Sequence, residues 1–249
     1  RQNKMIDNQL YRIFFKNLKV ILLAEALYED VKKYVARKDV LICPNGIPEA
    51  LSEEPTAKRN NSIPHLLFLS NLLVDKGVFT LLDACKILKE KGYSFVCNFI
   101  GGETAEIDSA RFEQEVKARE LNQIITYEGK KYGKEKSESF QNADIFVFPT
   151  YYSNECFPLV LLEAMQQGLP CISTNEGGIS EIIIPDETGC IIKKKSPQEL
   201  ADKIEFLLNN PNKRIDMGNR GFERYKQLFT LKAFEQRIVS ILNIAIFRQ

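Results

Sequence analysis

Short apolar runs alternate along the chain with longer amphipathic segments. The runs are rich in β-branched and aromatic residues, which predicts buried strands. We expect these strands at 20–24, 40–43, 66–70, 95–100, 124–128, 144–148, 171–173 and 190–192. Helices are expected in the gaps between the strands, and the clearest are 78–89, 112–121, 159–167, 197–208 and 234–245. In the first of these, apolar residues recur at helical spacing. This alternation predicts an α/β fold, a Rossmann-like parallel sheet covered by helices on both faces.

Turn residues and polar residues divide this pattern into two parts. Residues 44–48 contain two prolines and a glycine, and the stretch at 52–62 has few large apolar residues. Such a stretch is typical of a linker. Near the N-terminus, residues 10–19 combine bulky apolar side chains with cations. We expect a helix that covers a domain there, and the alternative is a helix that lies on a membrane surface.

Composition is that of an ordinary soluble globular protein. The chain has 249 residues, 44% of them hydrophobic, and its 34 basic residues nearly cancel its 33 acidic ones. This balance gives no broad electrostatic footprint for nucleic acid. No run of about 18 apolar residues occurs, so we expect no membrane-spanning helix. The chain opens on Arg1 without a secretory signal pattern, and we expect an expression boundary or a trimmed N-terminus.

The sequence gives little support for nucleophilic catalysis by a cysteine or for a metal site. The six cysteines are scattered without a C-x-x-C pair, which is typical of reduced core thiols in a cytoplasmic protein. Cys156 neighbours Glu155, but a thiol nucleophile usually requires a base, and the one histidine, His65, precedes a predicted strand. The G-x-G-x-x-G, Walker A and Asp-x-Asp motifs for dinucleotides, triphosphates and metal-held sugar nucleotides are absent.

Two carboxylates flank the start of a predicted helix. Glu155 follows the strand at 144–148, and Glu163 lies inside the helix at 159–167, which we expect to begin near Pro158. In open parallel sheets, ligands bind beyond the carboxyl ends of the strands, where a helix start offers free N–H groups to anions. Carboxylates accept hydrogen bonds from hydroxyl groups. A diphosphate flanked by two sugars fits this charge pattern, although two glutamates at this spacing often occur by chance.

The order of motifs beyond Glu155 is longer and more specific. It runs Glu155…Phe157-Pro158…Glu163-Ala164-Met165…Gly168-Leu169-Pro170…Gly177-Gly178…Glu181…Thr188-Gly189. This order resembles the nucleotide-sugar half of the retaining group 1 (family 4) glycosyltransferases, which have the GT-B fold. The resemblance covers mainly their C-terminal, donor-binding domain.

The resemblance implies a division of the chain. Relatives end their N-terminal domain with a Pro-Asn-Gly segment, which stands here at 44–46. The implied parts are a remnant of the N-terminal acceptor domain at 1–48, a linker at 49–64, the nucleotide-sugar-binding domain at 65–230 and a C-terminal helix at 231–249 that crosses back towards the N-terminal domain. Because most of the acceptor domain would be missing, we expect little or no transferase activity from this chain alone.

The resemblance also implies two catalytic residues, Lys76 and Glu155. Lys76 would contact the diphosphate and stabilise the charge of the leaving group. Glu155 would face hydroxyl groups of the donor sugar. Relatives commonly carry Gly-Arg-Leu earlier in the lysine loop, with the arginine also on the phosphates. Here Ser70 and Asn71 replace the glycine and the arginine, so Asn71 would donate a hydrogen bond without bringing a charge.

Further donor contacts are implied at three places. The backbone N–H groups of Phe157 and Leu159 would face sugar and phosphate, while Pro158 between them cannot donate. Glu163 would accept hydrogen bonds from the ribose hydroxyls. Gly129-Lys130 stands at the position of a loop that contacts the nucleobase in relatives, and a simple surface turn is an equal alternative for these two residues.

These implied roles describe the donor-binding half of a retaining hexosyltransferase. It would transfer a sugar from a nucleotide diphosphate sugar to an acceptor, in polysaccharide or glycoconjugate synthesis. No metal or other cofactor is expected. The alternatives are a non-catalytic sugar-nucleotide-binding module and a sugar-nucleotide epimerase of similar architecture.

The expected partners follow from the same resemblance. A saccharide or lipid-linked acceptor would be bound mainly by the missing domain, and no nucleic acid is expected. We expect a cytoplasmic protein, with peripheral contact at the inner membrane face as a further option. The exposed remnant at 1–48 would either form a homodimer or pack against the C-terminal helix around Phe234.

Overall fold

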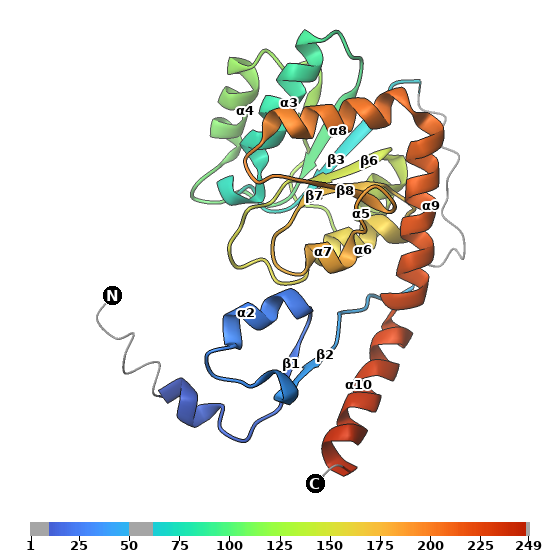
Figure 1. Ribbon diagram of the computed structural model, residues 1–249. Coiled ribbons are helices and arrows are strands. Elements are labelled where there is room, and N and C mark those ends of the chain that lie inside the picture. The colour runs from blue at the N-terminus through green and yellow to red at the C-terminus, as the bar shows by residue number, and fades with distance from the viewer. Residues whose placement is uncertain (1–9, 50–61, 248–249) are drawn as a thin grey trace.

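Two lobes make up the computed structural model, which describes residues 10–49 and 62–247 (Figure 1). The large lobe is built on a six-stranded parallel sheet of order β5-β4-β3-β6-β7-β8. Its strands are β3 (His65–Leu69), β4 (Val96–Ile100), β5 (Ile125–Tyr127), β6 (Ile145–Phe148), β7 (Cys171–Thr174) and β8 (Gly189–Ile192). In the small lobe, β1 (Val20–Leu22) and β2 (Val40–Ile42) form a parallel two-stranded sheet. The eight predicted strands are confirmed, with differences only at their ends.

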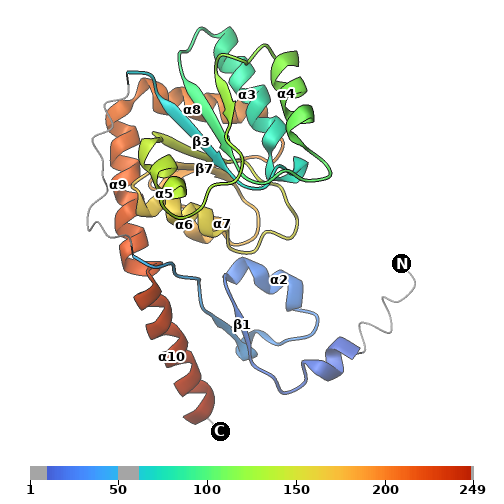
Figure 2. The same cartoon turned by 180° about the vertical axis from the view of Figure 1, so that it is seen from behind.

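Helices cover both faces of the large sheet, which confirms the predicted fold class (Figures 1 and 2). One face carries α3 (Val78–Glu90), α4 (Ser109–Ala118) and α8 (Pro197–Asn209). The other face carries α5 (Gly133–Asn142), α6 (Leu159–Gln166) and the short α7 (Ile179–Ile182). All residues of β6 are buried, because both faces of this central strand are covered.

Aromatic side chains join the sheet to its helices. The ring of Phe68 on β3 lies 5.0 Å from that of Phe99 on β4, and Phe99 lies 5.0 Å from Phe112 on α4. These three side chains are almost completely buried. Burial of each stabilises the fold by about 1.5–3 kcal/mol, so the sheet that carries the site loops is firmly held.

One long helix was not among the helices predicted most clearly. α9 (Pro211–Leu228) contacts α6 of one layer and α8 of the other. Its sequence is polar and contains Gly218 and Gly221, which lower helix propensity. A Cβ on Gly218 would lie closer than 3.0 Å to the carbonyl oxygen of Gly168, where α6 ends. The glycine that weakens the helical pattern is therefore the residue that lets α9 pack against the chain beyond α6.

The domain-covering helix predicted at 10–19 is shorter than expected. Within that range, helical residues extend over 10–14, and Phe14 is 67% exposed. The two-stranded sheet of the small lobe offers little area for a helix to cover. Tyr11 packs instead against Tyr34, with ring centroids 5.4 Å apart. The remaining short elements of this lobe are η1 (Glu25–Leu27), α2 (Tyr28–Val31) and η2 (Arg37–Asp39).

The chain crosses between the lobes at two points that lie side by side. The N–H of Ile47 donates to the carbonyl of Phe229 at 2.9 Å, and the N–H of Leu231 donates to the carbonyl of Ile47 at 2.8 Å. Ile47 and Thr230 thereby form an isolated parallel bridge. Of the predicted linker at 49–64, residues 50–61 lie outside the described residues.

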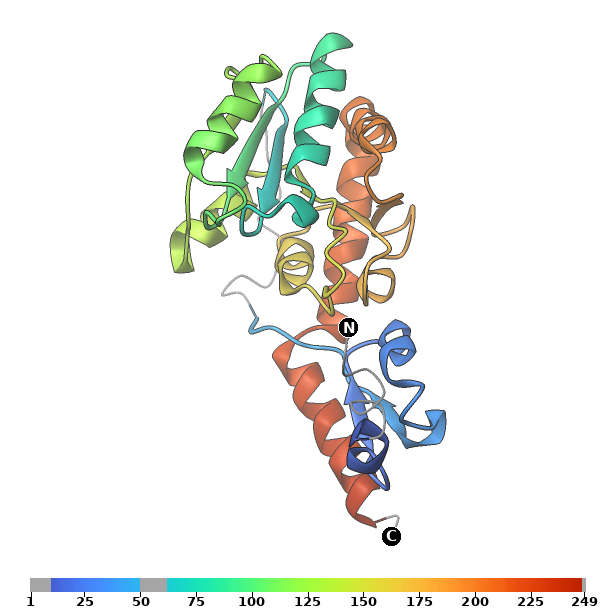
Figure 3. The same cartoon turned by 90° about the vertical axis from the view of Figure 1, so that its left-hand side faces the viewer.

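The last helix runs along the small lobe (Figure 3). α10 (Leu231–Phe247) begins directly after the second crossing. Arg237 on this helix donates from Nη1 to the carbonyl of Pro44 at 2.8 Å, and Ile241 is buried. A Cβ on Gly46 would lie closer than 3.0 Å to Cβ of Phe234. Residues 44–46 therefore pack directly against the start of α10.

Candidate functional site

The strand order opens a crevice between two loops. β3 and β6 are neighbours in the sheet, but the chain continues from β3 to β4 on one side and from β6 to β7 on the other. At such a switch point the two loops diverge and leave room for a ligand at the carboxyl edge of the sheet. The first loop contains η3 (Val74–Lys76), and the second contains Glu155. The topology therefore brings the two residues predicted to be catalytic to the same edge.

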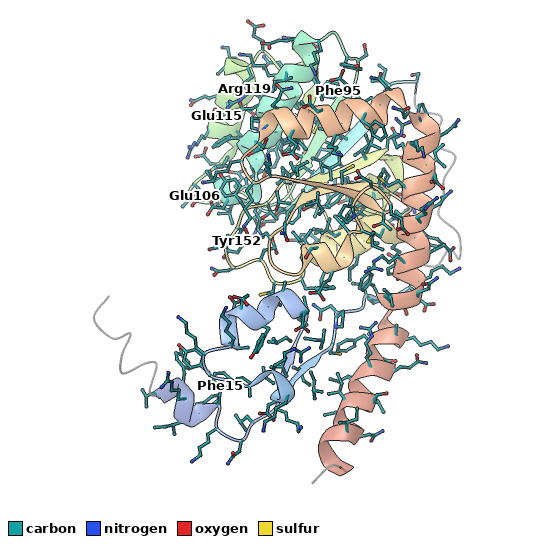
Figure 4. All side chains as sticks on the ribbon, viewed as in Figure 1. Phe15, Phe95, Glu106, Glu115, Arg119 and Tyr152 are labelled. Carbon is teal, nitrogen blue, oxygen red and sulfur yellow. The ribbon has the colours of Figure 1, made fainter. Side chains whose placement is uncertain are left out.

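Lys76 and Glu155 form an ion pair at this edge. The Lys76 ammonium lies 2.6 Å from Oε2 of Glu155, and the two side chains are 14% and 10% exposed. Thr150 donates its hydroxyl to the same carboxylate oxygen at 3.3 Å. The ring of Tyr152 lies 4.5 Å from the ammonium, at the edge of the large lobe that faces the small lobe (Figure 4). Because the pair is largely withdrawn from water, a ligand that separates it must offer an anion to the lysine and hydroxyl donors to the carboxylate.

Close backbone packing fixes the carboxylate side of this pair. Gly177 has a φ of 52°, in the left-handed region that favours glycine. A Cβ on Gly177 would lie closer than 3.0 Å to the carbonyl oxygen of Glu155, so no other residue fits there without movement. The next residue, Gly178, donates its N–H to the carbonyl of Cys156 at 2.7 Å. The turn at 177–178 therefore holds the backbone from which the Glu155 side chain extends.

A tyrosine joins the two loops. The N–H of Tyr151 donates to the carbonyl of Asp75 at 2.7 Å. Burial, and then the carboxylates of Asp75 and Glu106, raise the pKa of the Tyr151 phenol. The phenol is therefore neutral around pH 7, and it carries no negative charge that would oppose an anionic ligand.

α6 begins directly beyond Glu155. Pro158 is its N-cap, with φ −71° and ψ 113°, so the helix starts at Leu159. The first N–H groups of a helix have no partner inside the helix, and Leu159 is 44% exposed, so this end is open to solvent. Phe157 differs, because its ring is buried and packs edge-on against Phe229 at 5.9 Å. Its side chain anchors the loop, and only its backbone can face a ligand.

Glu163 is paired with a lysine that the sequence reasoning missed. Nζ of Lys136 on α5 lies 2.6 Å from Oε1 of Glu163. Oε2 of Glu163 is buried and has no hydrogen-bond partner among the described residues. Both side chains line a recess of about 100 Å³ between α5 and α6. An unpaired buried acceptor destabilises the free protein, and a hydroxyl donor in the recess would satisfy it. The two residues lie 27 positions apart, so only the packing of α5 against α6 reveals the pair.

A second group of predicted residues gathers where β3, β4 and β5 end. Oδ1 of Asn71 accepts from the N–H of Gly102 at 3.3 Å. The N–H of Gly101 donates to the carbonyl of Gly129 at 2.9 Å. The side chain of Lys130 extends over Gly102. Asn71 and Lys130, which the resemblance assigns to different parts of a ligand, therefore lie beside the same glycine.

The histidine and the cysteines do not assemble into a nucleophilic centre. His65 is the first residue of β3, at the opposite end of the strand from the lysine loop, and its N–H donates to Oδ2 of Asp144 at 2.9 Å. Five cysteines are buried, and only Cys156 is exposed. This distribution agrees with core thiols and a structural histidine.

A family model for group 1 glycosyl transferases matches residues 52–224, which is more than half of the chain. The chain belongs to this family. The capsular polysaccharide biosynthesis glycosyltransferase CapM of Staphylococcus aureus is 27% identical over 176 residues, which cover 71% of this chain and 45% of CapM. The chain thus spans about half the length of the curated relatives it matches.

Solved structures extend this family relation to the fold. Sucrose-phosphate synthase from Thermosynechococcus elongatus matches with a TM-score of 0.81 and 22% identity, over 100% of this chain and 63% of that one. Anabaena HepE in complex with UDP-glucose matches with a TM-score of 0.77 and 17% identity, over 95% of this chain and 68% of that one. These likenesses show that the chain folds as part of a GT-B glycosyltransferase.

In this group 1 glycosyltransferase chain, the small lobe touches the elements that flank the site. The N–H of Ala26 donates to Oε1 of Glu181 on α7 at 2.9 Å. A Cβ on Gly178 would lie closer than 3.0 Å to Cβ of Ala24. Gly178 and Glu181 lie one and four residues after Gly177, which abuts the Glu155 backbone. The small lobe therefore borders the same crevice that holds the ion pair.

Positive charge around the site comes from lysines such as Lys76 and Lys130. Within 10–49 and 62–247, no group of three or more histidine, cysteine, aspartate or glutamate side chains is placed to hold a metal ion.

Among the helices of the same ranges, none is long and apolar enough to span a bilayer.

Proposed function

We propose that the chain is the donor-binding part of a retaining glycosyltransferase that takes a hexose from a nucleotide diphosphate sugar. The observation that supports this best is the Lys76–Glu155 ion pair at the switch point of the sheet. A cation and a carboxylate side by side, next to the open start of α6, match a ligand in which an anionic diphosphate adjoins a polyhydroxyl sugar. The UDP-glucose bound by HepE, which shares the fold, supports the same ligand class.

In the proposed complex the donor separates the ion pair. Phosphate oxygens contact the Lys76 ammonium, and sugar hydroxyls donate to Glu155. As the bond between the sugar and the phosphate breaks, negative charge grows on the departing diphosphate, where Lys76 and the N–H groups at the start of α6 stabilise it. The acceptor oxygen bonds to the anomeric carbon from the same face, and its proton passes to the phosphate. Glu155 orients the sugar and forms no covalent bond.

The remaining contacts hold the nucleoside. The free Oε2 of Glu163 accepts a hydrogen bond from a ribose hydroxyl, and Lys136 keeps the other carboxylate oxygen in place. Asn71 donates to the diphosphate. Neither a metal nor another cofactor takes part, because lysines and the helix start supply the positive charge. A titration repeated in the presence of EDTA tests that point, since loss of donor binding would contradict it.

The proposed acceptor is a saccharide or a lipid-linked saccharide, in polysaccharide or glycoconjugate synthesis. CapM, the relative described above, is named for capsular polysaccharide biosynthesis. Catalysis requires that donor and acceptor be held in attack geometry. The chain spans less than half of CapM, so the acceptor pocket is proposed to lie in the part of the relatives that has no counterpart here. For the same reason we propose little or no transfer by the 249 residues alone.

Calorimetric titration with UDP, GDP, ADP and their hexose conjugates tests the proposal. We expect one nucleotide to bind, and its sugar conjugate to bind more tightly than the bare diphosphate. The matched control for Glu155→Gln is Glu205→Gln, because Glu205 is also paired with a lysine, Lys91, but lies on α8. A folded chain that binds none of these compounds would contradict the proposal.

Activity assays separate the alternatives. Donor binding without transfer, by a protein that also carries the acceptor-binding part, would favour a non-catalytic module. Interconversion of the donor sugar in the absence of an acceptor would favour an epimerase. Transfer to an acceptor with the anomeric configuration unchanged, read by NMR of the product, is the outcome expected here.

A further inference from the structure

Lys130 is a cation without a counterion at the edge of the candidate site. Its side chain is exposed, and its ammonium makes no ion pair or hydrogen bond with the described residues. Its neighbour Lys131 differs, because its ammonium is paired with Glu128 and lies 3.3 Å from the hydroxyl of Ser139. The two lysines are adjacent in sequence, yet only Lys130 is free to meet an anion.

The free ammonium is directed across the end of the sheet. The position of a Cβ on Gly102 would lie 3.4 Å from Nζ of Lys130 and 3.0 Å from Oδ1 of Asn71, and it would overlap Cε of Lys130. Lys130 therefore extends from the loop after β5 over the turn that follows β4, where Asn71 also lies beside Gly102. Glycine at 102 leaves the space that this path requires. The direction leads towards the crevice between β3 and β6.

The site requires more positive charge than Lys76 supplies. The ammonium of Lys76 lies 2.6 Å from the carboxylate of Glu155, which neutralises it in the free protein. Asn71, which follows β3 on the same side, is uncharged, and its Oδ1 is already bonded to Gly102. A diphosphate brings charge on both phosphates, and charge-assisted hydrogen bonds hold such groups more strongly than neutral ones. A second cation beside Asn71 meets this requirement.

We propose that Lys130 is this second cation and binds the diphosphate of the donor, with Asn71 beside it as a neutral donor. The inference rests on the proposed function and names a determinant of donor affinity within it. It assigns Lys130 to the phosphates, whereas the resemblance alone implies a contact with the nucleobase. It also gives Gly102 a role, because any larger residue would displace the lysine.

Binding measurements on Lys130→Ala test the inference. The probes are UDP, GDP and ADP by calorimetry, and uridine, guanosine and adenosine by ligand-observed NMR. For the nucleotide that the unmodified chain binds, we expect Lys130→Ala to weaken diphosphate binding about tenfold, which corresponds to one charge-assisted contact. Binding of the matching nucleoside should stay unchanged. Lys131→Ala is the matched control and should leave both affinities unchanged, because Lys131 is occupied by Glu128.

Two further variants examine the geometry. In the Lys130→Ala background, Asn71→Arg should restore most of the diphosphate affinity, because it returns a cation to the same place. Gly102→Ala should weaken diphosphate binding in the otherwise unmodified chain by moving Lys130 aside, and circular dichroism checks that this variant is folded.

The outcomes separate the inference from the proposed function. If the unmodified chain binds no nucleoside diphosphate, the proposed function is contradicted and the inference with it. If the chain binds a diphosphate and Lys130→Ala binds it equally well, only the inference is overturned. If Lys130→Ala loses as much affinity for the nucleoside as for the diphosphate, Lys130 contacts the nucleobase, and the inference is likewise overturned.

Discussion

The ammonium of Lys76 and the carboxylate of Glu155 lie 2.6 Å apart, although 79 positions separate the two residues in the sequence. Each charge is largely shielded from water, so each depends on the other for compensation. A change at either residue therefore alters the stability of the free protein as well as any ligand contact. Experiments on this pair have to measure both quantities.

Glu155→Gln should weaken binding of the sugar more than binding of the nucleotide. The change leaves the Lys76 ammonium without its counterion, so we also expect a loss of about 1–3 kcal/mol in the free energy of unfolding. Calorimetry with a nucleoside diphosphate and with its hexose conjugate measures the first effect, and urea unfolding measures the second. If the bare diphosphate loses as much affinity as the conjugate, Glu155 does not act on the sugar.

Glu163→Gln should weaken nucleotide binding by roughly 1.5–3 kcal/mol, because a carboxylate that accepts from ribose hydroxyls makes charge-assisted hydrogen bonds. The measurement is calorimetry with the nucleoside diphosphate and with its 2′,3′-dideoxy form. The unmodified chain should bind the dideoxy form less tightly, and Glu163→Gln should show a smaller difference between the two forms, because its amide oxygen accepts without a charge. A variant whose preference for the ribose form is undiminished would show that Glu163 does not bind these hydroxyls.

Gly177→Ala should destabilise the fold more than Gly133→Ala, although both glycines have nearly the same φ, 52° and 50°. The left-handed backbone alone costs about 1–2 kcal/mol for a non-glycine residue, and nothing lies within 4 Å of a Cβ on Gly133. A Cβ on Gly177 meets the carbonyl of Glu155, so the loop must move. Urea unfolding should show an additional loss of at least about 1 kcal/mol. Equal losses in the free energy of unfolding of the two variants would mean that the Glu155 loop moves aside without a measurable cost.

Alkaline pH should destabilise the fold through Cys190. Burial raises the pKa of its thiol from 9.0 to about 11, and burial also raises the pKa of Cys171 on the adjacent strand β7. The unfolded chain therefore releases the Cys190 proton near pH 9, before the folded chain does. The stabilisation is complete below that pH and is lost as the pH rises through the interval up to about 11.

Urea unfolding at pH 8 and at pH 10 measures this effect. Cys190→Ala should lose less stability between the two pH values than the unmodified chain, whatever its stability at pH 8. Cys156→Ala is the control, because Cys156 is exposed, and it should lose as much as the unmodified chain. An undiminished loss in Cys190→Ala would contradict the assignment.

The parts of the fold that sequence could predict are those fixed by local patterns. Buried parallel strands are nearly continuous apolar runs, so β3 to β8 were recognisable. α9 was not, because Gly218 weakens the helix locally and its benefit comes from a contact with Gly168, 50 positions away. The covering helix expected at 10–19 is shorter for the opposite reason: its sequence combines apolar residues with cations, but the small sheet offers little area for it to cover.

For the candidate site, too, local motifs could be predicted from the sequence, whereas contacts between distant residues could not. Lys76 and Glu155 were each predicted from motifs in their own loops, whereas their pairing depends on the order of the strands. Lys136 had no local signal, because it meets Glu163 only through the packing of two helices. The closeness of Asn71 and Lys130 likewise required the ends of three strands to be placed side by side.

The double crossing between the lobes restricts how they can move. A single connecting segment would leave the small lobe free to rotate about the chain. Here two segments are hydrogen-bonded to each other at Ile47, and this pairing resists twisting. Bending at the paired segments leaves the hydrogen bonds from Ile47 to Phe229 and from Leu231 to Ile47 in place. Twisting the two segments against each other breaks these bonds. A bending motion that keeps both hydrogen bonds would carry Ala26 towards or away from Glu181. Bending at the crossing would therefore change the width of the crevice without breaking the contact between its two segments.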